Sequence, residues 1–125
     1  MGLFGKSKTD ILVVDDSPTV LEMLHSVLTL NYSVEVADNG KKALRMAEKK
    51  KPSLIVLDMH LPDIEGWEVC KILKESSSTK KIKILMCTAD SKGKEVERAF
   101  EVGAEGYIIK PVTPEKLLSK VKELI

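Results

Sequence analysis

Residues 11–18 read ILVVDDSP, a short apolar run that ends in two adjacent acidic residues and a Ser-Pro pair. A continuous aliphatic run of this kind is typical of a strand that is covered on both faces of a parallel sheet. Ser17 or Asp16 followed by Pro18 is typical of the start of a helix. The stretch therefore predicts a strand, a turn that carries two carboxylates, and a helix.

The same rhythm recurs along the chain and predicts the fold class. Strands are predicted over residues 11–15, 34–37, 54–58, 82–87 and 107–110, and helices at about 18–30, 40–50, 65–75, 92–102 and 114–125. Apolar stripes at helical spacing are expected to face the sheet: Leu21, Leu24 and Leu28; Ala43, Leu44 and Ala47; Trp67, Cys70 and Leu73; Leu117, Leu118, Val121 and Leu124. Strands that alternate with amphipathic helices predict an α/β fold, a single domain with a doubly wound parallel sheet.

The composition excludes several classes of function. The chain has 125 residues, 43% of them hydrophobic and 31% charged, with a net charge of +1, which is typical of one soluble globular domain. That balance gives no indication of binding to nucleic acid or to an anionic membrane. No apolar run approaches the roughly 20 residues that span a bilayer, and we expect a cytoplasmic protein. Cys70 and Cys87 have no zinc-ligand spacing and are expected to be buried thiols.

Residues 1–8 are expected to form a mobile leader. Gly5, Lys6 and Ser7 imitate the end of a phosphate-binding P-loop, but the required preceding strand and glycine spacing are absent. Gly2 suggests N-myristoylation, but Lys6 stands where that motif has Ser or Thr. Neither motif is therefore expected to function.

Polar residues stand at the carboxyl ends of four of the predicted strands: Asp15 and Asp16, Asp58, Thr88 and Lys110. Ligands bind outside the carboxyl ends of the strands in open parallel sheets, so these side chains are expected to converge. Clustered carboxylates repel one another and raise at least one pKa, and Mg²⁺ relieves that repulsion because it prefers oxygen ligands. Mg²⁺, an ammonium group and a hydroxyl suit a phosphoryl group, which one carboxylate accepts as an aspartyl-phosphate.

Each of these residues also has an ordinary structural explanation. Asp16 before Ser-Pro is most often a helix cap, a strand-end Thr is usually a satisfied surface hydroxyl, and Lys110 would normally be solvated. Asp58 is harder to explain in this way because its charge directly follows a buried run. The occurrence of all of them at four strand ends favours the functional interpretation.

Four motifs carry a resemblance to a known family. ILVVDDSP, IVLDMHLPDIEGWE, CTA and GAEGYIIKP match, in order and spacing, the receiver domain of two-component response regulators, the small phosphoacceptor proteins of bacterial signalling. The resemblance covers about residues 9–125, which we interpret as the receiver domain. It implies the flavodoxin-like strand order 2-1-3-4-5 with five helices.

The resemblance also assigns a phosphoacceptor and a metal site. Asp58 resembles the phosphorylated aspartate of the family. Asp16 and Asp58 resemble direct Mg²⁺ ligands, joined by the backbone carbonyl of His60, with Asp15 acting mainly through water. Mn²⁺ is the alternative ion.

Further residues are implied to sense the phosphoryl group. Thr88 resembles the hydroxyl that bonds a phosphoryl oxygen and follows it on activation, and Tyr107 occupies the place of the aromatic switch. Lys110 resembles the lysine that binds a phosphoryl oxygen, and the Lys110–Pro111 bond is typically cis in this family.

His60 and Asp90 occupy the places that tune the lifetime of the phosphoryl group in the family. We hypothesise that His60 overhangs the site and changes the access of hydrolytic water; the alternative is a solvated loop imidazole. His25 is expected to be a boundary residue on the first helix rather than a phosphoryl carrier.

The resulting functional prediction is a signalling switch. Asp58 is expected to receive a phosphoryl group from the phosphohistidine of a sensor histidine kinase or a histidine phosphotransfer protein. The surface of the fourth helix, fifth strand and fifth helix would then change for a downstream protein partner. If Ile125 is the natural end of the chain, no DNA-binding segment follows it, and we expect output through a protein partner without direct contact with nucleic acid. We also expect no membrane contact, and a monomer or weak dimer. Chemotaxis, a phosphorelay and the sensory part of a larger regulator all remain open.

Two other classes compete with this prediction. One is a small Mg²⁺-dependent phosphohydrolase that uses an aspartyl-phosphate, although the first strand offers DDS where haloacid-dehalogenase-type enzymes have DxD. The other is a receiver-fold adaptor that is never phosphorylated, although such proteins often lose an acidic or lysine position that this chain retains. We expect no enzyme activity beyond the domain's own phosphorylation and dephosphorylation.

Overall fold

The computed structural model describes residues 8–125, so the predicted leader and its two glycine motifs lie, except for Lys8, outside the described residues. The strands are β1 (Ile11–Val14), β2 (Val34–Ala37), β3 (Leu54–Asp58), β4 (Lys83–Thr88) and β5 (Gly106–Ile109). The helices are α1 (Pro18–Leu28), α2 (Gly40–Lys50), α3 (Gly66–Glu75), α4 (Lys94–Glu101) and α5 (Pro114–Leu124). In the described part of the chain, none of them combines the length and the hydropathy of a membrane-crossing helix.

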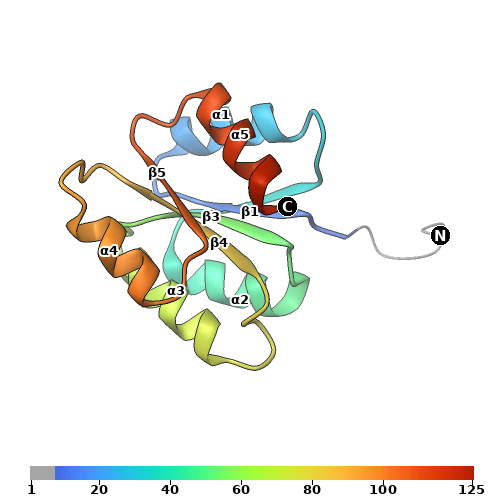
Figure 1. The fold of residues 1–125 in the computed structure, drawn as a ribbon. Helices are drawn as coiled ribbons and strands as arrows, with labels where there is room; N and C mark the ends of the chain where they lie inside the picture. Colours follow the sequence, from blue (N-terminus) through green and yellow to red (C-terminus); the bar gives the residue numbers. More distant parts are fainter. Residues whose placement is uncertain (1–7) are drawn as a thin grey trace.

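The strands form one parallel sheet in the order β2-β1-β3-β4-β5, and the predicted fold class and strand order are confirmed. Helices α1 and α5 cover one face of the sheet, and α2, α3 and α4 cover the other (Figure 1). Ile11 pairs with Val34 on one side and with Leu54 on the other, so β1 and β3 lie inside the sheet. The carboxyl ends of all strands therefore meet along one edge.

Several predicted boundaries are displaced by one or two residues. β4 begins one residue later than predicted and includes Thr88, because Thr88 still pairs with Ile109 of β5. The helix predicted over residues 92–102 begins at Lys94, since Gly93 precedes it in the left-handed region with φ of 90°. It ends at Glu101, close to Gly103, whose φ is 101°. These differences do not move any predicted strand to another place in the sheet.

The hydrophobic core has two layers that follow the alternation of the strands. Ile11 and Val13 face α1 and α5, whereas Leu12 and Val14 face α2 and α3. The predicted helical stripes supply the rest, with Leu24, Leu28, Ala43, Ala47, Cys70, Leu73, Leu117 and Val121 buried. The remaining stripe residues are only partly buried and pack at the margins: Leu21, Leu44, Trp67, Leu118 and Leu124.

Both cysteines are free and buried, as predicted. Burial raises the pKa of each thiol, Cys70 and Cys87, to about 12. Thiols in this state are unreactive and serve the packing of α3 and β4.

Lys74 joins three segments at the end of the sheet that lies opposite to the carboxyl edge. Its ammonium group donates to the carbonyl oxygens of Lys80 at 3.2 Å and Ile82 at 2.6 Å, and to Glu105 Oε2 at 2.7 Å. Glu105 Oε1 in turn accepts from the Ile84 amide at 2.8 Å. Lys74 thereby fixes the end of α3 against the start of β4 and the turn before β5.

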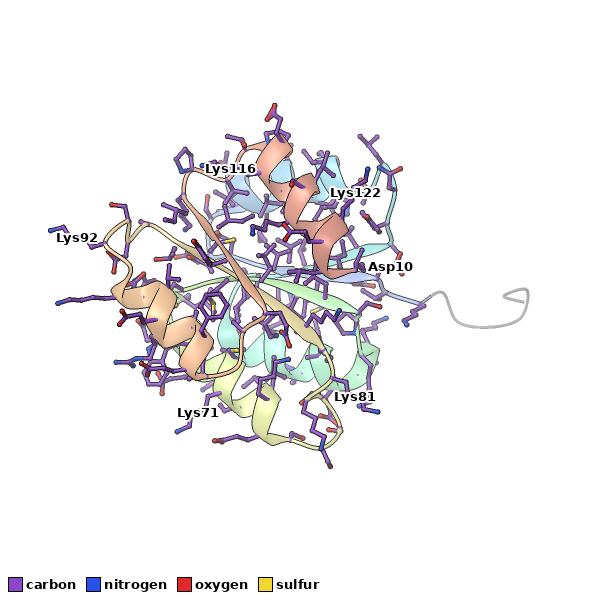
Figure 2. The ribbon with its side chains drawn as sticks, in the orientation of Figure 1. Asp10, Lys71, Lys81, Lys92, Lys116 and Lys122 are labelled. Carbon is purple, nitrogen blue, oxygen red and sulfur yellow. The ribbon has the colours of Figure 1, made fainter. Side chains whose placement is uncertain are left out.

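We predict that Lys74→Met lowers the free energy of unfolding by about 2 kcal/mol, because it leaves the partly buried Glu105 carboxylate without its cation. Urea unfolding followed by circular dichroism measures the change. Lys71→Met is the matched control, since Lys71 lies exposed on the outer side of the same helix (Figure 2). Equal losses for the two variants would contradict this role of Lys74.

Candidate functional site

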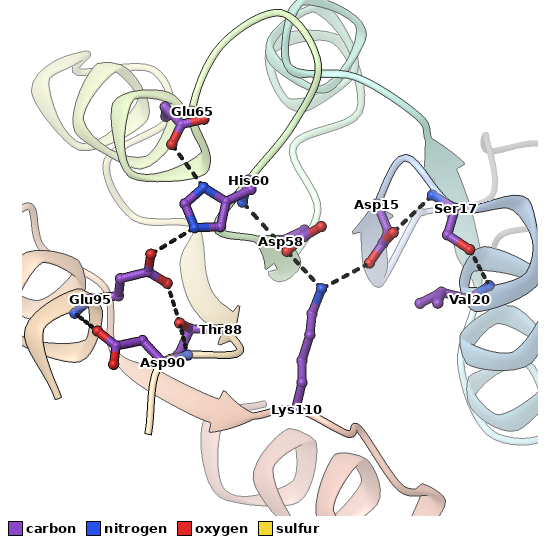
Figure 3. Close-up of polar contacts among 10 residues, drawn as sticks. All are labelled: Asp15, Ser17, Val20, Asp58, His60, Glu65, Thr88, Asp90, Glu95 and Lys110. Carbon is purple, nitrogen blue, oxygen red and sulfur yellow. Dashed lines mark hydrogen bonds and ion pairs between the residues drawn. The ribbon is translucent and has the colours of Figure 1, made fainter. Parts of the chain in front are cut away.

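The polar residues predicted at the strand ends lie together at the carboxyl edge of the sheet (Figure 3). Asp15 follows β1, Asp58 ends β3, Thr88 ends β4 and Lys110 follows β5. The Lys110 Nζ atom lies 3.0 Å from Asp58 Oδ1 and 3.9 Å from Asp15 Oδ2. An ammonium group thus joins two carboxylates that come from different strands.

The acidic part of this edge consists of Asp15, Asp16 and Asp58. Each offers one carboxylate oxygen, and these oxygens all lie within 4.8 Å of one another. Asp15 and Asp58 are buried, with exposed fractions of 4% and 5%, whereas Asp16 is exposed. Asp15 Oδ1 also accepts a hydrogen bond from the Ser17 amide at 2.9 Å.

The charge of this cluster is incompletely compensated. Burial, reinforced by the negative charge of Asp58, raises the pKa of Asp15, although the Ser17 amide and Lys110 act in the opposite direction. The sequence predicted that repulsion among the three carboxylates would raise the pKa of at least one of them, but burial is the larger cause of the raised pKa of Asp15. Oxygen ligands with surplus negative charge fit a divalent cation such as Mg²⁺.

Lys110 keeps its charge at this site. Burial by itself lowers the pKa of Lys110, but the hydrogen bond to Asp58 and the charges of Asp58 and Asp15 outweigh it, so the pKa is raised. The Lys110 amide donates to the Thr88 carbonyl oxygen at 2.7 Å, and the Lys110–Pro111 bond is cis. The ammonium group is therefore positively charged at neutral pH and held at the carboxylates.

Thr88 lies at the same edge but makes different contacts. Its hydroxyl donates to Glu95 Oε1 and accepts from the Asp90 amide at 3.0 Å. The Asp90 carboxylate accepts from the amides of Lys92 at 2.9 Å and Glu95 at 3.1 Å, and these bonds lower the pKa of Asp90. The Asp90 side chain thus stabilises the loop before α4 and the first turn of that helix by accepting hydrogen bonds from their backbone amides.

The imidazole of His60 lies between two carboxylates. Its Nδ1 atom is 2.9 Å from Glu65 Oε2 and its Nε2 atom is 2.6 Å from Glu95 Oε2. The hydrogen bond to Glu95, together with Glu65, raises the pKa of His60. Only the backbone amide of His60 approaches Asp58, at 3.5 Å from Oδ1. The ring is therefore directed toward α3 and α4, and its effect on hydrolytic water stays a prediction.

Tyr107 and His25 lie away from the carboxylates. Tyr107 is half-buried on β5, with its ring edge-on to Phe100 at 5.9 Å between centroids. His25 is exposed in the last turn of α1. The switch role of Tyr107 stays a prediction.

Sequence reasoning missed Gly66, which brings α3 close to the end of β3. A Cβ atom on Gly66 would lie 2.0 Å from the carbonyl oxygen of Asp58, so only glycine fits there. The Gly66 amide donates to the Met59 carbonyl oxygen at 2.7 Å. The sequence signal that could have revealed this close approach is a glycine near the start of the helix predicted over residues 65–75.

Asp63 was also missed, and it attaches the loop between β3 and α3 to the start of α2. Its carboxylate accepts from the amides of Gly40 at 2.8 Å and Lys41 at 2.9 Å. Asn39 caps the next free amide, that of Lys42. The loop that carries His60 is thereby fixed to a second helix.

Comparison with known proteins gives a consistent result. Residues 11–122 match the family model described as response regulator receiver domain. The chain is 38% identical over 116 residues to the alkaline phosphatase synthesis transcriptional regulatory protein PhoP of Bacillus subtilis, covering 92% of this chain and 48% of that protein. The chain thus spans about half the length of the curated relatives that it matches.

Solved structures agree on the fold. The chemotaxis protein CheY4 of Vibrio cholerae has a TM-score of 0.88 and 32% identity, covering 95% of this chain and 100% of that chain. The receiver domain of the sensor histidine kinase PA1611 from Pseudomonas aeruginosa, solved with a magnesium ion coordinated in its active site cleft, has a TM-score of 0.85 and 24% identity. It covers 94% of this chain and 98% of that chain, and at this identity it supports the fold alone.

We predict that Asp63→Asn lowers stability at neutral pH and that its effect disappears in acid. The amide of Lys41, with those of Gly40 and Ile64, lowers the pKa of Asp63 below 3.8. A lowered pKa contributes stability above the unfolded-state value, and that contribution is lost as the pH falls through the folded-state value. Urea midpoints measured over a pH series test this expectation.

Asp38→Asn is the control for this series, because Asp38 lies near the same helix end but, within residues 8–125, its carboxylate accepts a hydrogen bond only from the Asn39 side chain. We expect Asp38→Asn to have a smaller effect on stability at neutral pH than Asp63→Asn. An Asp63→Asn effect that stays constant with pH would exclude the carboxylate–amide bonds as its origin.

Proposed function

The chain belongs to the response regulator receiver domain family, and from this membership we propose that it is a phosphorylation switch whose acceptor is Asp58. The observation that carries the proposal is the Lys110 ammonium group, 3.0 Å from Asp58 Oδ1 beside two further carboxylates. A buried carboxylate with a fixed cation at one oxygen is prepared to receive an anionic group at the other.

We assign the nucleophilic attack to Asp58 Oδ2. Oδ1 is engaged by Lys110 and, more distantly, by the His60 amide. Oδ2 would form the bond to phosphorus while the bond between phosphorus and the histidine nitrogen of a partner kinase or phosphotransfer protein breaks. Lys110 compensates the charge of the transferred oxygens during this step. The histidine nitrogen keeps the electron pair of the broken bond, and because the other ring nitrogen carries a proton, the imidazole leaves in its neutral form.

Asp15, Asp16 and Asp58 would hold the metal ion, together with the backbone carbonyl of His60 that the family resemblance implies. Mg²⁺, or Mn²⁺ as an alternative, supplies positive charge to the phosphoryl oxygens when it is bound. The PA1611 receiver domain, which shares the fold, has a magnesium ion coordinated in its own active site cleft. Of the two adjacent acids, we assign Asp16 as a direct ligand beside Asp58 and Asp15 as a ligand acting mainly through water, because Asp15 Oδ1 already accepts from Ser17.

The output of the switch is assigned to the surface of α4, β5 and α5. Thr88 would move toward the phosphoryl group and Tyr107 would turn inward, which changes this surface for a downstream protein. Tyr107 borders a shallow groove with Ile109, Lys116 and Lys120, and Phe100 is half-exposed beside it. His60 and Asp90 would tune the lifetime of the phosphoryl group.

We predict that incubation with acetyl phosphate or phosphoramidate and Mg²⁺ adds the mass of one phosphoryl group, because Asp58 accepts it. Intact-mass spectrometry detects the increment, which Asp58→Asn should abolish. Asp38→Asn, an exposed aspartate outside the site, should keep it. No increment in the unmodified chain would favour an adaptor, and rapid multiple turnover of the phosphodonor would favour a phosphohydrolase.

We further predict that Asp16→Asn raises the Kd for Mg²⁺ about tenfold more than Asp15→Asn, which corresponds to about 1.4 kcal/mol. Both substitutions remove one negative charge, and Asn at position 15 retains an acceptor for the Ser17 amide. Isothermal titration calorimetry with MgCl₂ measures both constants. Equal losses would show that the inner and outer ligands are assigned wrongly.

A further inference from the structure

Glu95, in the first turn of α4, joins the phosphoryl-sensing hydroxyl to two loops (Figure 3). Its Oε1 atom accepts from the Thr88 hydroxyl, and its Oε2 atom lies 2.6 Å from His60 Nε2. The Glu95 amide donates to Asp90 Oδ2 at 3.1 Å. We call the group Thr88, His60 and Glu95 the Glu95 latch.

The hydrogen bond from Thr88 to Glu95 limits what the Thr88 hydroxyl can bind. A threonine hydroxyl can donate one hydrogen bond, and here Glu95 accepts that bond. The hydroxyl oxygen already accepts from the Asp90 amide. A phosphoryl oxygen on Asp58 is also only an acceptor, so Thr88 cannot bond to it without leaving Glu95. The two arrangements of Thr88 are therefore mutually exclusive.

We propose that Glu95 is a positioning residue that competes with the phosphoryl group for Thr88 and holds the domain in its unphosphorylated arrangement. The proposal rests on the function proposed above and adds the group that the phosphoryl oxygen must displace. A carboxylate acceptor makes a stronger hydrogen bond than a neutral one, so the Thr88 hydroxyl leaves Glu95 only at a cost that the phosphoryl oxygen, also a charged acceptor, has to offset.

The second contact of Glu95 extends the effect to α3. His60 connects Glu95 to Glu65, which precedes α3, so the latch joins the loop after β3, the end of β4 and the start of α4. The same residues border a hollow whose other wall includes Trp67, with the Arg98 guanidinium 4.5 Å from the centroid of its ring. Opening of the latch should therefore change the surroundings of Trp67, the only tryptophan of the chain.

Beryllofluoride, a phosphoryl analogue, tests the proposal in the full chain with Mg²⁺, with Trp67 fluorescence as the readout and calorimetry as a check. Glu95→Ala should bind it about tenfold more tightly, because Thr88 no longer has to leave a charged acceptor. Glu97→Ala is the matched control, since Glu97 is an exposed acidic residue in the same first turn, and its affinity should equal that of the unmodified chain.

Two variants separate the latch from a general effect of charge. In a Thr88→Val background, Glu95→Ala should have no effect, because the contested hydroxyl is gone. Glu95→Gln should bind with an affinity between those of the unmodified chain and Glu95→Ala, since its amide oxygen still accepts from Thr88 without a charge. An effect that persists undiminished in Thr88→Val, or equal affinities of the Gln and Ala variants, would show that Glu95 acts by charge alone and would overturn the latch.

The unmodified chain distinguishes this proposal from the function on which it rests. If that chain binds beryllofluoride and takes up a phosphoryl group but Glu95→Ala behaves identically, only the latch is wrong. If the unmodified chain does neither, the phosphoacceptor function and the latch are both overturned.

Discussion

The ion pair between Asp58 and Lys110 is the interaction on which the site depends. A buried carboxylate is costly unless a positive charge lies beside it, and Asp58 is only 5% exposed. Its partner comes from the chain after β5, which β4 separates from β3 in the sheet. The pair therefore forms only if Asp58 is in register with Cys87 and Cys87 with Ile108. The Asp58 charge is therefore compensated only when β3, β4 and β5 are paired in the correct order and register.

The loop after β3 combines two buried apolar side chains, Met59 and Leu61, with polar contacts closer to the surface. Asp63 attaches it to α2, and His60 attaches it to Glu65 and Glu95. Close packing at Gly66 fixes its distal end against the backbone of Asp58. Hydrogen bonds and ion pairs near the surface exchange partners at lower cost than buried apolar contacts do. Such a loop keeps the acceptor in place while its neighbours remain able to rearrange.

The sequence predicted the sheet and the residues at its carboxyl edge because both follow from local patterns. Apolar runs indicate strands, and the polar residue after each run must lie at the edge. A raised pKa for at least one carboxylate of the cluster was also expected; the pKa of Asp15 is raised, with burial rather than repulsion as the larger cause. The Glu95 latch was not predictable in this way, since His60 and Glu95 are 35 residues apart. Glu95 also gave no separate signal in the sequence, because an acidic residue in the first turn of a helix is already explained by its favourable interaction with the helix dipole.

The helix that carries Glu95 is also the one with the least apolar anchoring among those in residues 8–125. α4 contributes a single buried residue, Ala99, whereas α1 and α5 contribute two each and α3 contributes four. Its Phe100 is 48% exposed beside Tyr107. A two-state element responds to a ligand only if the free energies of its two arrangements are close. Because so little burial holds α4, the polar contacts of Glu95 and Asp90 form a large share of what fixes its first turn. Under the proposed latch, exchange of the hydrogen bond at Thr88 would remove one of the polar contacts that hold this turn, and the position of α4 would then be free to change.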